Sequence, residues 1–82
     1  MNDSRILVVD DEPGLRRALV RVLSPGHEVV AVSGVTEALE RVTGEEFDLA
    51  LVDIRLADGN GYNLCQQIRS LRPETDVILM TG

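Results

Sequence analysis

Four oxygen-bearing side chains stand directly after short aliphatic runs of the chain. They are Asp10 and Asp11 after the first run, Asp53 after the third and Thr81 after the fourth. If the runs are parallel strands, their carboxyl ends meet at one edge of a sheet, where open α/β sheets bind ligands. Two carboxylates about 4 Å apart repel by roughly 4 kcal/mol at an effective dielectric constant near 20, so a bound cation is the natural remedy. Oxygen ligands at this density predict a Mg²⁺ site at Asp10, Asp11 and Asp53.

Such a site can also support phosphoryl chemistry. A divalent cation neutralises the oxygens of an incoming phosphate, so that a carboxylate can attack phosphorus in line. The product would be an aspartyl phosphate.

The competing interpretation is that aspartates simply mark turns, because Asp between a strand and a helix is a common capping residue. We adopt this interpretation for four others, which are Asp3, Asp48, Asp58 and Asp76. The pair Asp10 and Asp11 alone would fit either interpretation. Asp53 and Thr81 at corresponding strand ends favour a site.

The four aliphatic runs alternate with three segments of helical periodicity, which predicts the order β-α-β-α-β-α-β. Strands are expected at residues 6–9, 29–32, 49–52 and 77–80, and helices near 13–23, 35–42 and 64–71. Helices that join parallel strands cross over right-handedly in nearly every case, so a doubly wound sheet is the economical architecture.

Local signals refine the predicted helices. Pro13 suits the start of the first helix. Ser33 is a plausible N-cap of the second, and Gly44 stands just beyond its expected end. Three arginines fall off the apolar stripe of the first helix and are expected on a solvated face, namely Arg16, Arg17 and Arg21.

Composition narrows the class of protein. The 82 residues suffice for one domain, and the formal net charge of −6 opposes generic binding to nucleic acid or to an anionic membrane. No apolar run has the length of a membrane span, and the first residues lack the layout of a secretory signal. The single Cys65 is compatible with a reducing compartment. We therefore expect a soluble cytoplasmic protein.

Several motifs occur in order along the chain. They are Ile6-Leu7-Val8-Val9-Asp10-Asp11-Glu12-Pro13, then Leu51-Val52-Asp53-Ile54-Arg55-Leu56, then Gly61, then Met80-Thr81-Gly82. Together they resemble the receiver domain of bacterial two-component response regulators. The resemblance implies one receiver domain over residues 1–82, with a flavodoxin-like sheet of order 2-1-3-4. It also implies a phosphorelay module that a sensor histidine kinase phosphorylates, rather than a conventional enzyme.

The resemblance assigns roles to individual residues. Asp53 is similar to the phosphoacceptor of the family. Asp10 and Asp11 resemble its acidic pair, in which Asp11 would be the direct ligand of Mg²⁺. The main-chain carbonyl of Arg55 would be another ligand, and Thr81 resembles the hydroxyl residue that turns toward a phosphoryl oxygen.

The chain departs from the family pattern in two places. Ala57 stands where the family often has proline, which would leave the loop after Asp53 less rigid. The lysine that follows a fifth strand in the family has no counterpart before Gly82, and all eight basic residues of the chain are arginine. One cationic contact and the usual switch surface would therefore be missing.

The expected sheet also lacks the family's final strand and last helices. The fourth strand would then be a bare edge, and apolar atoms on the face of the first helix would be exposed. A few hundred Å² of such surface corresponds to several kcal/mol at roughly 25 cal/mol/Å², comparable with the ~5–15 kcal/mol stability of a domain. We therefore expect a homodimer or a strand-exchanged oligomer.

Two other functions stay open. One is an interaction module that cannot switch. The other is a phosphohydrolase of the haloacid dehalogenase type, which also uses a strand-end aspartate and a later Ser or Thr. That class needs a second aspartate two residues after the first, and Arg55 stands there.

Overall fold

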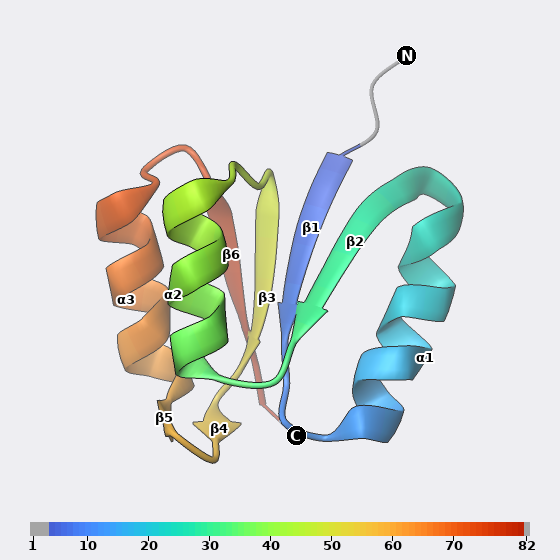
Figure 1. The fold of residues 1–82 in the computed structure, drawn as a ribbon, viewed down its shortest axis with the longest axis horizontal. Helices are drawn as coiled ribbons and strands as arrows, with labels where there is room; N and C mark the ends of the chain where they lie inside the picture. Colours follow the sequence, from blue (N-terminus) through green and yellow to red (C-terminus); the bar gives the residue numbers. More distant parts are fainter. Residues whose placement is uncertain (1–3, 82) are drawn as a thin grey trace.

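A computed structural model describes residues 4–81 as a four-stranded parallel sheet covered by helices on both faces (Figure 1). In chain order the elements are β1 (Ser4–Val9), α1 (Pro13–Leu23), the short 3₁₀ helix η1 (Ser24–Gly26), β2 (His27–Val32), α2 (Val35–Gly44), β3 (Leu49–Asp53), β4 (Arg55–Leu56), β5 (Gly59–Asn60), α3 (Gly61–Leu71) and β6 (Asp76–Met80). The predicted alternation of strands and helices is confirmed, with η1 and the β4–β5 hairpin as additions.

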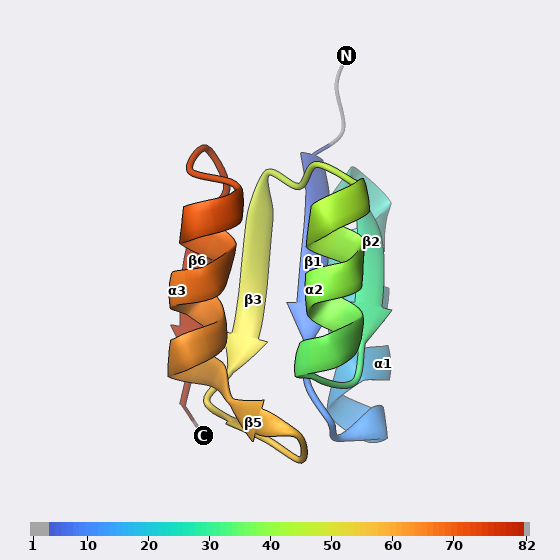
Figure 2. The same ribbon diagram turned by 60° about the vertical axis from the view of Figure 1, so that its left-hand side comes forward.

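The sheet order is β2-β1-β3-β6, and all three pairings are parallel. Since β6 is the fourth long strand, this is the expected order 2-1-3-4 of a doubly wound sheet. Helix α1 lies on one face and helices α2 and α3 lie on the other (Figures 1 and 2). The register pairs Val9 with Val52 and Asp53 with Met80, so the carboxyl ends of the central strands are level.

The two faces of the sheet are packed differently. The main core lies between the sheet and the helices α2 and α3, where Leu7, Ala50 and Leu64 have no exposed surface. Helix α1, by contrast, contains no buried residue. Val77 and Leu79 pack against the core cluster, so the strand alternation turns Ile78 to the α1 side, where it is 51% exposed.

Within residues 4–81, no helix is both long and apolar enough to cross a membrane.

Some local predictions were wrong. The N-cap of α2 is Gly34, and Ser33 instead donates its N–H and its hydroxyl to Glu37. Gly44 is the last residue of α2 and not the residue beyond it. Of the residues in the sequence predictions, Asp3 and Gly82 lie outside the described range.

Candidate functional site

Asp10 directly follows β1 and is almost completely buried, with 1% of its surface exposed. Its N–H donates to the carbonyl of Val32 at 3.1 Å, which joins the carboxyl ends of β1 and β2. Its Oδ1 accepts the N–H of Glu12 at 2.8 Å. Its Oδ2 is buried and has no hydrogen-bond partner among the described residues. A buried carboxylate oxygen without a hydrogen-bond donor is energetically costly, so Oδ2 is suited to contact a cation.

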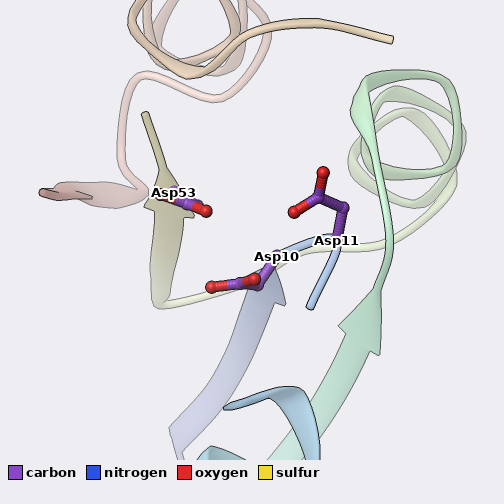
Figure 3. Close-up of side chains that lie close together, drawn as sticks. All are labelled: Asp10, Asp11 and Asp53. Carbon is purple, nitrogen blue, oxygen red and sulfur yellow. The ribbon is translucent and has the colours of Figure 1, made fainter. Parts of the chain in front are cut away.

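Three carboxylates converge at this rim. Asp10, Asp11 and Asp53 each offer an oxygen, and the three oxygens lie within 4.8 Å of one another. Figure 3 shows the carboxylates facing a common space, with Asp53 at the end of β3 and the other two at the end of β1. The structure thus brings together the three predicted metal ligands.

The electrostatics of the cluster are unfavourable without a cation. Burial raises the pKa of the Asp10 carboxyl, and the charges of Asp53, Asp11 and Glu12 raise it further. The hydrogen bond from the N–H of Glu12 opposes this rise. A hard cation would reverse the balance, because it favours the charged form of every carboxylate that it contacts. The donor set therefore fits Mg²⁺.

The carboxylates line an open pocket of about 340 Å³. Its other lining residues are Glu12, Leu15, Ile54 and Arg55. The N–H of Arg55 lies 3.5 Å from Oδ1 of Asp53, which places the start of β4 beside the candidate acceptor. The pocket has room for a small anionic group next to Asp53.

Gly61 keeps the acceptor strand and α3 close together. Its N–H donates to the carbonyl of Ile54 at 2.9 Å. A Cβ atom at this position would lie 1.9 Å from the main-chain oxygen of Asp53, a distance that no side chain tolerates. Only glycine fits here, because the backbone of the acceptor strand occupies the place of a side chain.

Thr81 lies at the same rim but outside the pocket lining. It directly follows Met80, which pairs with Asp53 and accepts the N–H of Ile54 at 3.0 Å. The residue is exposed. The structure therefore places the predicted hydroxyl one residue beyond the strand partner of the acceptor.

Two charged residues contribute to the site in ways that sequence patterns did not indicate. Arg16 was expected on a solvated face, but its Nη1 donates to the main-chain oxygen of Asp10 at 2.8 Å. Asp58 was interpreted as a turn residue, but its carboxylate accepts the N–H groups of Val35 at 2.8 Å and Thr36 at 3.2 Å. The loop after Asp53 is therefore bonded to the first turn of α2.

Comparison with known proteins decides the family. The model of the response regulator receiver domain matches residues 6–82. The chain belongs to this family. It is 39% identical over 81 residues to the DNA-binding transcriptional activator DevR/DosR of Mycobacterium tuberculosis, a match that covers 95% of this chain and 37% of that protein.

Solved receiver structures have the same fold. A receiver domain protein from Methanospirillum hungatei superposes with a TM-score of 0.95 at 35% identity, covering 99% of this chain and 66% of that one. A response regulator from Burkholderia pseudomallei with a phosphorylated aspartic acid and a calcium ion gives a TM-score of 0.92 at 30% identity, covering 98% and 48%. The regulator TrrA of Thermotoga maritima in complex with Mg²⁺ and beryllofluoride gives 0.89 at 34% identity, covering 95% and 69%.

This receiver chain spans only part of its longer relatives. It covers 37% of DevR/DosR and 19% of the Pseudomonas aeruginosa regulator PilR. The activities and partners of those longer proteins therefore describe those proteins and are not assigned to this chain. The family match identifies a response regulator receiver domain, and the structure shows an acidic pocket at the carboxyl end of its sheet.

Proposed function

We propose that this receiver module accepts a phosphoryl group on Asp53 from a histidine kinase in a two-component phosphorelay. The observation that carries the proposal is the convergence of three carboxylates, one of which, the buried Asp10, has an Oδ2 with no hydrogen-bond partner among residues 4–81. The Burkholderia regulator with a phosphorylated aspartic acid supports it by similarity. The domain would use residues 1–82 as one signalling unit in the cytoplasm and would catalyse its own phosphorylation without being a conventional enzyme.

The proposed metal ligands are the carboxylates of Asp10, Asp11 and Asp53 and the main-chain carbonyl of Arg55. The all-oxygen donor set and the buried orphan oxygen support Mg²⁺ as the cation. When bound, Mg²⁺ would offset the negative charge of the carboxylates and of the incoming phosphoryl oxygens.

The transfer itself is a single displacement at phosphorus. An oxygen of the Asp53 carboxylate forms the new bond to phosphorus as the bond from phosphorus to the donor nitrogen breaks. The leaving imidazole keeps the electron pair of the broken bond. Gly61 contributes by letting α3 start against the acceptor strand, which fixes the backbone of Asp53.

Thr81 is the proposed reporter of phosphorylation. Its exposed hydroxyl follows the strand partner of Asp53, so a small movement of the chain after β6 would bring it toward a phosphoryl oxygen. Thr81→Ala should leave the amount of label on Asp53 unchanged while removing any change in the chemical shifts of β6 that accompanies labelling.

The chain should be incubated with Mg²⁺ and acetyl phosphate, followed by intact-mass measurement and assay of released phosphate. A persistent mass increase that is absent from Asp53→Asn supports the receiver function. Continuous phosphate release with little label would support the phosphohydrolase instead. No reaction would support the interaction module, and label that survives in Asp53→Asn would contradict the site.

We also propose that the chain forms a homodimer or strand-exchanged oligomer through β6 and the adjoining sheet face. Ile78 on this face is 51% exposed, and β6 pairs only with β3 within residues 4–81. An open strand edge beside apolar side chains is a typical pairing surface. Sedimentation at micromolar concentration tests this: a monomer that melts cooperatively would contradict it.

A further inference from the structure

The β4–β5 hairpin, residues 55–60, begins at Arg55, which lines the acidic pocket, and the hairpin is held at two points. At its base the N–H of Gly61 donates to the carbonyl of Ile54 at 2.9 Å. At its tip Asp58 accepts the N–H groups of Val35 and Thr36 on α2. Figures 1 and 2 show the hairpin beneath the start of α2. The strands of the hairpin are two residues each, so these outside contacts fix its position.

The contact at the tip replaces a cap that α2 lacks. The N-cap residue is Gly34, which has no side chain to accept the first N–H groups of the helix. The Asp58 carboxylate, more than twenty positions away in sequence, takes over this role for two of them. A helix start and the phosphoacceptor loop are therefore joined through one side chain.

Glycines on both sides let the two segments approach. A Cβ atom on Gly34 would lie 2.6 Å from Oδ1 of Asp58, and a Cβ atom on Gly59 would lie 2.9 Å from Cγ2 of Val35. Both distances are shorter than real Cβ atoms show. The backbone of Gly34 is extended, with φ of −164°, a conformation that any residue can adopt. Glycine is therefore needed here because a side chain would collide with Asp58, and not because of the backbone conformation.

We propose that Asp58 is a positioning residue of the acidic site: by holding the hairpin against α2, it sets where the Arg55 backbone lies beside Asp53 and so sets the affinity for a divalent cation. The inference rests on the proposed metal site. Because coupling between two equilibria is reciprocal, cation binding must in turn tighten the contact of Asp58 with α2.

Mg²⁺ alone is the probe, and its dissociation constant should be measured by calorimetry on the parent chain and four variants. Asp58→Ala should weaken binding about fivefold or more, the lower range of typical coupling effects. Gly34→Ala keeps every charge but pushes the carboxylate away, so it should weaken binding by a similar factor. Asp58→Asn keeps one acceptor oxygen and should fall between Asp58→Ala and the parent.

Glu37→Ala is the matched control. It also removes one exposed negative charge and one set of hydrogen bonds at the start of α2, those from Ser33, but it leaves the hairpin untouched. Its Mg²⁺ affinity should stay within about twofold of the parent, a change below typical coupling effects. An equal loss in Glu37→Ala and Asp58→Ala would show that only charge or helix stability matters, and would overturn the inference.

Hydrogen exchange on the unaltered chain tests the reciprocal effect without any substitution. Saturating Mg²⁺ should slow exchange of the Val35 and Thr36 amides by the factor found for Asp58→Ala, beyond any slowing of amides inside α2 that reports global unfolding. Equal slowing of exchange at all amides would contradict the positioning role of Asp58, and so would a Mg²⁺ affinity that Asp58→Ala leaves unchanged. Neither result would contradict the metal site itself. A parent chain that binds no Mg²⁺ would contradict the metal site proposed above, whereas failure of acetyl phosphate to label Asp53 would leave this inference standing.

Discussion

Charged side chains are paired with opposite charges at the amino end of the sheet, whereas carboxylates cluster together at its carboxyl end. At the amino end Arg5 pairs with Glu28 at 3.3 Å and with Glu45 at 2.6 Å, and its guanidinium lies 4.9 Å from the centre of the Phe47 ring. At the carboxyl end three carboxylates face one another, and Oδ2 of Asp10 has no partner among residues 4–81.

At the amino end, side chains also donate hydrogen bonds to backbone carbonyls. At the amino end Arg72 donates to the carbonyls of Val42 and Thr43, and the buried hydroxyl of Thr75 donates to the carbonyl of Phe47. These bonds close the loops that enter and leave the strands. The amino end of the sheet therefore stabilises the fold, whereas the carboxyl end holds clustered carboxylates that form no ion pair among residues 4–81.

The largest effect on stability is expected from Gly61→Ala at the carboxyl end. The added Cβ would overlap the main-chain oxygen of Asp53, so the acceptor strand and α3 must separate. We expect a loss of about 3 kcal/mol in the free energy of unfolding, measured by urea titration. Gly44→Ala is the control, because a Cβ there meets nothing within 4 Å. Equal stability of the two variants would contradict the close approach.

Asp10→Asn should separate stability from binding. Without divalent cations at neutral pH it should stabilise the fold by about 1 kcal/mol, because it removes a buried charge whose ionisation the fold disfavours. In the parent the raised pKa means that stability is full below the ordinary aspartate range and falls as pH rises through the folded pKa. The gain from Asp10→Asn should therefore vanish in acid.

The same variant should bind Mg²⁺ at least about tenfold more weakly, since it loses a charged ligand. Thermal unfolding with and without Mg²⁺ measures both effects. If Asp10→Asn is less stable than the parent at every pH in the absence of cations, the ionised Asp10 carboxylate does not destabilise the fold, and the prediction is wrong.

Thr75→Val tests the amino end, with a smaller expected effect on stability than Gly61→Ala. It removes the hydroxyl that donates to the Phe47 carbonyl at 2.7 Å and keeps the shape of the side chain. We expect a loss of about 1–2 kcal/mol in stability with no change in the affinity for Mg²⁺. A parallel loss of Mg²⁺ affinity in calorimetry would show that the two ends are not independent.

The smallest effect is expected from Glu45→Gln. The hydrogen bond from Arg5 lowers the pKa of the Glu45 carboxyl, and the charges of Arg41 and Arg5 lower it further. Its stabilising contribution is therefore present above the ordinary glutamate range and is lost as pH falls, the reverse of the dependence at Asp10. The loss should be smaller than that of Thr75→Val and should shrink at high salt, as thermal melts across pH will show.

Sequence patterns predicted the sheet and the acidic rim for a simple reason. Continuous aliphatic runs mark strands that are covered on both faces, and whatever follows them must gather at one edge. Asp10, Asp11 and Asp53 could therefore be placed together from their positions alone. The family resemblance supplied the strand order, which the runs do not encode.

The contact between the hairpin and α2, which the sequence did not reveal, joins residues far apart along the chain. Asp58 caps α2 across more than twenty positions, so the local rule that favoured Ser33 as N-cap selected the wrong residue. The strands of the hairpin are too short to show a period. Arg16 has the spacing of an exposed residue, but its long side chain reaches back to Asp10.

Peptide mapping of the labelled chain tests whether Asp53 is a cation-dependent phosphoacceptor. After incubation with acetyl phosphate, we expect a phosphoryl group on the peptide that contains Asp53 when Mg²⁺ is present and none when the cation is removed by EDTA. Asp10→Asn should reduce the label, and Thr75→Val should not. Label on another residue, or equal labelling of Asp53 with and without divalent cation, would contradict a cation-dependent phosphoacceptor site at the carboxyl end of the sheet.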